Sequence, residues 1–107
     1  MTVTPFPLTA QRALELIREV AGDSQRYTIP SPPTGGEWYR RVTRRQVELC
    51  LRDGDVIGEP QIDPATGTVL VTMERFSAGV LVRIGIVVWK SDNENWRVTV
   101  KTVEQRP

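Results

Sequence analysis

The sequence predicts a single α+β domain in which two N-terminal helices pack on one face of a four-stranded antiparallel meander sheet. Two segments in the first half keep the spacing of amphipathic helices, and the second half alternates apolar and polar residues between short turns. Because successive side chains of a strand point to opposite faces, this alternation gives the sheet one apolar and one polar face. The apolar phase comprises Val69, Val71, Met73, Val82, Ile84, Ile86, Val98 and Val100.

The first helix is expected from Thr9 to about Ala21. The Thr9 hydroxyl can accept a hydrogen bond from an unpaired amide of the first turn, and Leu8 can pack against that turn. Gly22 supplies the stop. A second helix is expected over Thr43 to Gly54, where Thr43 and Gln46 have the spacing of a capping box.

Four strands are expected after a short extended piece at Arg26 to Ile29 and a loop rich in Pro and Gly over 30–37. Turn-forming residues separate the strands Gln61–Asp63, Thr68–Phe76, Val80–Lys90 and Trp96–Val103. Because short turns join successive strands, neighbouring strands should run antiparallel in chain order, which is a meander.

Length and composition narrow the class of protein. The 107 residues allow one domain over 1–107, with 1–7 as a tail, and the formal net charge of +1 creates no strong global field. With no His and a single Cys, the usual zinc sites and a His general base are excluded, so no metal or cofactor is expected. No stretch approaches the roughly 20 apolar residues of a membrane span, and the N-terminus lacks a signal-peptide pattern. We therefore expect a cytoplasmic protein with no membrane contact.

A basic and aromatic cluster precedes and opens the second helix. Its members are Trp38, Tyr39, Arg40, Arg41, Arg44 and Arg45. Since a helix N-terminus favours anions, four arginines there suggest an external anionic ligand. Guanidinium groups match phosphate and carboxylate oxygens, and aromatic rings can stack on bases. The alternative is a solvated helix face whose arginines pair with Glu37 and Glu48.

The polar face of the sheet is the second candidate surface. It carries Phe76, Arg83, Trp89, Arg97 and Lys101 in one phase. These cations could hold phosphates while the rings stack on bases. Gly85 in the middle of a strand is costly unless something approaches the backbone closely there. The alternative is an ordinary solvated face with cross-strand pairs such as Glu74 with Arg83.

Acid–base chemistry would depend on carboxylates, because the chain has no His. Glu74, Glu48, or a perturbed Lys101 or tyrosine could act as general base. Arginines could stabilise the charge of a phosphoryl transition state. The spacing of these residues requires none of these roles.

The run from Thr43 to Gly54, followed by Ile57-Gly58-Glu59-Pro60, resembles the second-helix signature of a family of small bacterial domains related in fold to the RelE and BrnT ribonuclease toxins. Supporting stretches are Leu8–Val20, Met73–Gly79 and Val98–Val100. The resemblance implies helices on one side of an antiparallel sheet and an RNA-contacting opposite face. It also implies metal-independent RNA cleavage where the catalytic set survives.

The chain departs from that family before the second helix. Family members carry a His-Ala segment followed by Arg-Met, where this chain has Pro32-Pro33 and then Gly36 and Glu37. The resemblance leaves as possible catalytic contributors Arg40, Arg41, Glu74, Arg75 and Arg83. Of these, Glu74, Arg75 and Arg83 form the candidate catalytic set.

Two functional interpretations follow. In the first, the chain is a RelE/BrnT-like toxin-type domain of a toxin–antitoxin or mobile-element context that binds or cleaves RNA, or descends from domains that did. Phosphates would then be held by Arg40, Arg41, Arg83 and Lys101, with Trp89 or Tyr27 stacked on a base and Glu74 moving a proton. The protein partner of such a domain would be a cognate antitoxin. In the second, it is a non-catalytic protein-binding module, such as an inhibitor, immunity protein or antitoxin-like protein, that binds a target protein through Trp38, Tyr39 and the arginines. Trp, Tyr and Arg are common among interface hot spots.

Overall fold

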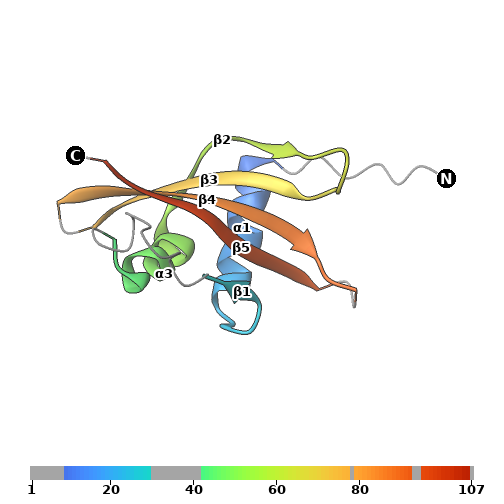
Figure 1. Cartoon of the computed structure of the whole chain (residues 1–107), viewed down its shortest axis with the longest axis horizontal. Helices are drawn as coiled ribbons and strands as arrows, with labels where there is room; N and C mark the ends of the chain where they lie inside the picture. The colour runs from blue at the N-terminus through green and yellow to red at the C-terminus, as the bar shows by residue number, and fades with distance from the viewer. Residues whose placement is uncertain (1–8, 30–41, 78, 93–94, 107) are drawn as a thin grey trace.

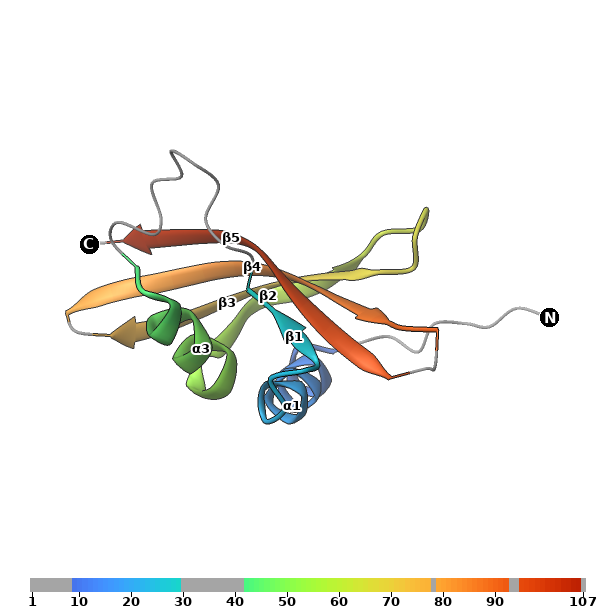
Figure 2. The same cartoon turned by 60° about the horizontal axis from the view of Figure 1, so that its bottom comes forward.

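In the part of the chain that it describes, a computed structural model shows a five-stranded mixed sheet with two helices on one face (Figures 1 and 2). The structure describes residues 9–29, 42–77, 79–92 and 95–106. The elements, in chain order, are α1 (Ala10–Ala21), β1 (Tyr27–Thr28), α3 (Arg44–Asp53), β2 (Asp55–Ile62), β3 (Val69–Ser77), β4 (Val80–Lys90) and β5 (Trp96–Arg106). The α+β class is therefore as predicted.

Both helices begin at the predicted caps. The backbone N–H of Arg12 donates to the Thr9 hydroxyl at 3.1 Å, and α1 ends at Gly22. At the start of α3, Thr43 and Gln46 form both hydrogen bonds of a capping box, at 3.1 and 2.8 Å. Caps satisfy backbone groups that the helix itself leaves unpaired, which is why these local signals locate the helix starts.

The predicted four-stranded antiparallel meander is wrong, because β1 adds a fifth strand that runs parallel to β5. The strand order is β1-β5-β4-β3-β2, and Tyr27 lies in register with Val98. The Val98 N–H donates to the Arg26 carbonyl at 3.1 Å. A two-residue strand has no periodicity to detect, and its partner lies some 70 residues further along the chain. β1 also lies between the two helices in the chain, so the protein does not begin with two helices followed by a sheet. The predicted RelE/BrnT-like fold, two N-terminal helices on a four-stranded meander, is therefore wrong as well.

Strands β2 and β5 are longer than predicted. The chain passes from α3 into β2 at Gly54, where a Cβ would lie 2.5 Å from the Cys50 carbonyl oxygen. This close approach requires glycine and lets the strand begin at Asp55 rather than near Gln61. β5 continues to Arg106 because a β-bulge opposite Gly85 and Ile86 inserts one extra residue and keeps the ladder paired.

The core lies between the helices and one sheet face. β4 shows the predicted alternation along its length, since Val82, Ile84, Ile86 and Val88 are buried and the residues between them are half-buried. The other residues of the predicted apolar phase, on β3 and β5, are buried with them. Among the described residues, every buried side chain is apolar, so the core contains no group that could do acid–base chemistry other than the Tyr27 hydroxyl and the Cys50 thiol.

No helix in the described ranges is long and apolar enough to cross a membrane.

Candidate interaction surface on the open sheet face

The sheet face opposite the helices is the candidate site. Both α1 and α3 lie on one side of the sheet, and no described helix or strand covers the other side, which we term the open face (Figures 1 and 2). Cross-strand register arranges its residues in rows. The first row is Asp55, Glu74, Arg83 and Glu104; the second is Ile57, Thr72, Gly85 and Thr102; the third is Gln61, Leu70, Val87 and Thr99. Trp89 and Arg97 lie opposite each other beyond the third row.

The first row neutralises Arg83. The guanidinium forms a hydrogen bond and an ion pair with the Glu74 carboxylate, with the two side chains 32% and 15% exposed. Asp55 and Glu104 lie in the same row on the flanking strands. The predicted cross-strand pair is therefore confirmed, and the surroundings of Arg83 repel a phosphate rather than attract one.

Trp89 and Arg97 also contact groups of the chain itself. The indole N–H of Trp89 donates to the Thr99 hydroxyl at 3.0 Å, and the Arg97 guanidinium lies 5.9 Å from the Trp89 ring centroid. Arg97 further donates to the Gln25 carbonyl at 2.5 Å. The ring that was expected to stack on a base therefore carries a cation of the protein.

Arg83, Arg97 and Lys101 share the open face but do not converge. Arg97 lies opposite Trp89, which is about 20 Å from Arg83 along β4 at about 3.3 Å per residue. Lys101 lies between them as the extra residue of the β-bulge. These cations form a sparse line and could not hold one phosphate group together.

The candidate catalytic set is divided between the two faces of the sheet. Glu74 and Arg83 are in contact on the open face, whereas Arg75 lies opposite the buried Val82 and so points to the helix side. There it interacts electrostatically with Cys50. Burial raises the pKa of the Cys50 thiol to about 12, partly offset by the Arg75 charge. The thiol is therefore protonated and unreactive near neutral pH.

Tyr27 is a core residue, not a surface ring. It is 8% exposed, and its hydroxyl donates to the Glu48 carboxylate at 3.1 Å. Burial, followed by the Glu48 carboxylate, raises the pKa of this phenol. Arg44 approaches the same carboxylate at 3.9 Å. Glu48 is therefore engaged by two neighbours, and Tyr27 cannot stack on a base.

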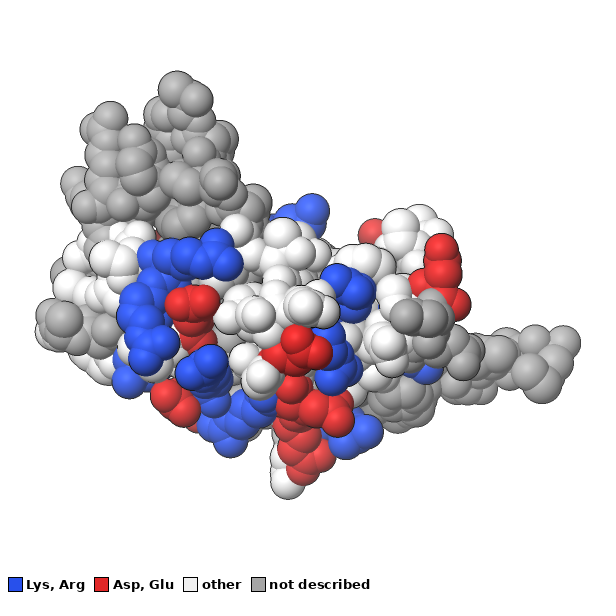
Figure 3. Space-filling model, turned by 90° about the horizontal axis from the view of Figure 1, so that it is seen from below, with Lys and Arg blue, Asp and Glu red and all other residues white. Residues whose placement is uncertain are grey.

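The described part of the basic cluster lies at the start of α3. Arg44 donates to the Ile29 carbonyl at 3.1 Å, Arg45 is exposed, and Arg52 is a further exposed cation that the prediction omitted. Trp38, Tyr39, Arg40 and Arg41 lie outside the described residues. Figure 3, which views the molecule from below, shows cations and carboxylates intermixed on that surface. α3 itself carries three arginines and two carboxylates, a mixed pattern more typical of a protein surface than of a phosphate-binding groove.

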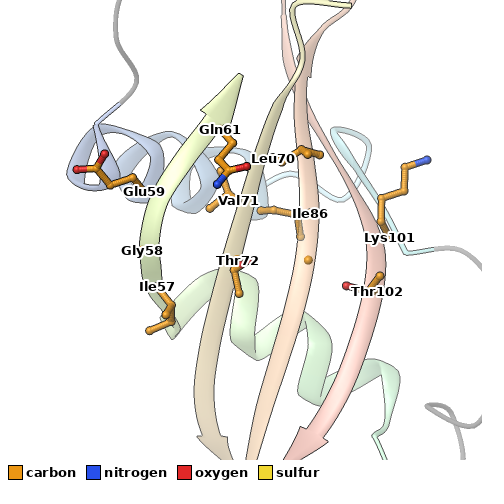
Figure 4. Close-up of a pocket in the computed structure, with 11 residues that line it drawn as sticks. Ile57, Gly58, Glu59, Gln61, Leu70, Val71, Thr72, Ile86, Lys101 and Thr102 are labelled. Carbon is orange, nitrogen blue, oxygen red and sulfur yellow. The ribbon is translucent and has the colours of Figure 1, made fainter. Parts of the chain in front are cut away.

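A trough in the open face crosses its centre (Figure 4). Its volume is about 430 Å³, and Gly85, Ile57 and Leu70 are among the residues that line it. Lys101 and Glu59 lie on opposite sides of it (Figure 4). A Cβ on Gly85 would lie 2.4 Å from the Thr102 hydroxyl oxygen, so the expected close approach is made by the neighbouring strand. Ile57 and Leu70 are 41% and 48% exposed. The sequence analysis missed the trough, although Gly85 signalled it.

No group of His, Cys, Asp and Glu side chains in the described ranges is arranged to hold a metal ion. In comparisons with known proteins, no protein-family model, no curated protein and no solved structure matches this chain.

Proposed function

We propose that this chain is a non-catalytic protein-binding module whose open face is the interface. The supporting observation is that large apolar side chains are exposed on this face while Arg83 and Arg97 are engaged by groups of the chain itself. Ile57, Leu70 and Phe76 are 41%, 48% and 69% exposed. Apolar side chains gathered on one face of a soluble domain favour contact with a protein, because burying them removes apolar area from water.

The state of the charges favours a protein partner over RNA. RNA binding depends on cations free to neutralise phosphates and on rings free to stack. On the open face, Arg83 is paired with Glu74, and Arg97 covers Trp89. The RNA-binding interpretation stays a prediction with weaker support.

The arrangement of candidate acids and bases supports a module without catalysis. Glu48 accepts a hydrogen bond from Tyr27, and Glu74 is held by Arg83. Arg75 lies on the other side of the sheet from both members of the Glu74–Arg83 pair. A cytoplasmic location belongs to the same proposal, since Cys50 is a free and buried thiol, as is common in reducing compartments.

Leu70→Asp tests the function. We expect it to weaken binding of the purified partner, identified by affinity capture and mass spectrometry, by about 30-fold or more, because it places a charge at the apolar centre of the interface. Gln11→Asp, which adds the same charge on the exposed side of α1, is the matched control and should bind as the wild type does. Retention of RNA with an affinity that falls steeply with salt, and that Leu70→Asp leaves unchanged, would contradict the proposal and support the RNA interpretation.

A further inference from the structure

We infer that a second copy of this chain occupies the open face, in a two-fold dimer whose axis runs parallel to the strands. The inference rests on the proposed protein-binding function and names its partner. It is supported by the distribution of charge across the sheet, the trough and the area of the face.

Opposite charges lie on the two outer long strands of the sheet. β2 carries Asp55 and Glu59 and no Lys or Arg, and it lies at one edge of the sheet. On the other side, β5 places Arg97 and Lys101 on the open face. Its Glu104 lies beside Arg83 in register, which screens that carboxylate. The open face is therefore polarised across the strands, acidic at β2 and basic at β5.

Lys101 and Glu59 are the charges that a partner can use. Both line the trough, and neither has an ion pair within the described part of the chain. They cannot pair with each other, because β2 and β5 are three strand spacings apart, about 14 Å. Buried in an interface, each requires an opposite charge from the other molecule.

Only one orientation of a two-fold axis brings Lys101 and Glu59 each opposite the other charge of the second copy. A two-fold axis that stacks a sheet face on itself lies in the plane between the two sheets. When the axis is parallel to the strands, β2 of each copy lies over β5 of the other, and Lys101 meets Glu59 of the second copy twice. In the first row, the Glu74–Arg83 pair then lies over its own copy in reverse order, whereas Asp55 lies over Glu104 of the second copy at the end of the face. An axis perpendicular to the strands would instead place Lys101 over Lys101.

The centre of the face fits the same arrangement. β3 of each copy lies over β4 of the other, so the protruding Leu70 meets the stretch from Gly85 to Val87 of the second copy. The trough beside Gly85, about 430 Å³, has room for that side chain. Two sheets packed face to face lie about 10 Å apart, a spacing that such interdigitation fills.

The area available is that of a weak specific dimer. Between Leu81 and Trp89 the face is about 27 Å long, and its four long strands are about 19 Å wide. This gives on the order of 500 Å² per copy, or about 1,000 Å² in total, at the low end for specific interfaces. We therefore expect a dimer of micromolar affinity that depends on salt concentration.

Charge reversal tests the dimer by sedimentation equilibrium at low salt. Wild type should dimerise, whereas Glu59→Lys and Lys101→Glu should each weaken dimerisation about tenfold, because two pairs per dimer become repulsive. A mixture of the two variants should form heterodimers with near-wild-type affinity, since both pairs regain opposite charges. On the helix side, Glu15→Lys and Arg12→Glu reverse another exposed ion pair and serve as controls that leave dimerisation unchanged.

Each contrary result has a distinct meaning. A wild type that stays monomeric up to about 0.5 mM overturns the dimer, as does a dimer that Leu70→Asp leaves intact or a mixture that fails to associate. Loss of the dimer alone leaves the protein-binding function in place if Leu70→Asp still abolishes binding of a different, identified protein. If the protein neither dimerises nor binds another protein in a way that depends on Leu70, the protein-binding function is overturned as well. Circular dichroism checks that each variant is folded.

Discussion

Among single residues, Glu74 is the one whose role differs most between the two interpretations. In an enzyme it would transfer a proton, whereas the structure shows it bound to Arg83 on a half-buried sheet surface. We expect Glu74→Gln to lower the free energy of unfolding by about 1–2 kcal/mol, because Arg83 loses a charged hydrogen-bond partner. Urea denaturation measures this, with Glu15→Gln as a control of smaller effect, because the ion pair of Glu15 with Arg12 is exposed to solvent. An unchanged stability would contradict a structural role for Glu74.

The close contact between Gly85 and Thr102 gives a second prediction for single residues. A Cβ at this position would lie 2.4 Å from the Thr102 hydroxyl oxygen. We expect Gly85→Ala to destabilise the wild type by about 1 kcal/mol but to be neutral or stabilising when Thr102 is already Ala. A double-mutant cycle from urea denaturation measures the coupling between the two sites. Additive effects would show that the contact with Thr102 does not explain the glycine.

At the scale of elements, the start of α3 depends on a reciprocal cap. Thr43 accepts from the Gln46 N–H, and the Gln46 side chain accepts from the Thr43 N–H. We expect Thr43→Ala to lower the free energy of unfolding by about 1 kcal/mol and Thr43→Ser to retain most of it. Thermal unfolding of the wild type and the two variants measures these differences in stability. Equal losses for Ala and Ser would show that the hydroxyl is not the group that matters.

The elements that the sequence located are those with local signals. The caps at Thr9 and Thr43 and the alternation along β4 lie within a few residues of the structures they specify, so each could be identified without knowing the fold. β1 was not identified as a strand, because Tyr27 and Thr28 become one only through hydrogen bonds to β5. The start of β2 was placed too late, since the passage at Gly54 depends on contacts with Cys50 and Glu74.

For the whole molecule, stability should fall at alkaline pH. Burial raises the pKa of Cys50 from 9.0 to about 12, and burial with Glu48 raises that of Tyr27. Between pH 9 and about 12 the unfolded chain releases the Cys50 proton while the folded chain retains it, and the raised pKa of Tyr27 acts in the same direction above pH 10. Stability is therefore full below pH 9 and declines above it. Urea denaturation from pH 8 to 11 measures the decline. Cys50→Ala should flatten it, and a wild-type curve that does not fall would contradict the burial of these groups.

The sequence by itself determined the α+β class, both helices with their caps, and the face to which each residue of β3 and β4 belongs, because helix caps and strand alternation act over a few residues. Tertiary structure decided the rest, because it depends on residues distant in the chain. It placed β1 beside β5, put Tyr27 in the core, and paired Arg83 with the Glu74 carboxylate. Alternation can place a charge on a face, but which neighbour lies within reach of that charge is set by the register between strands.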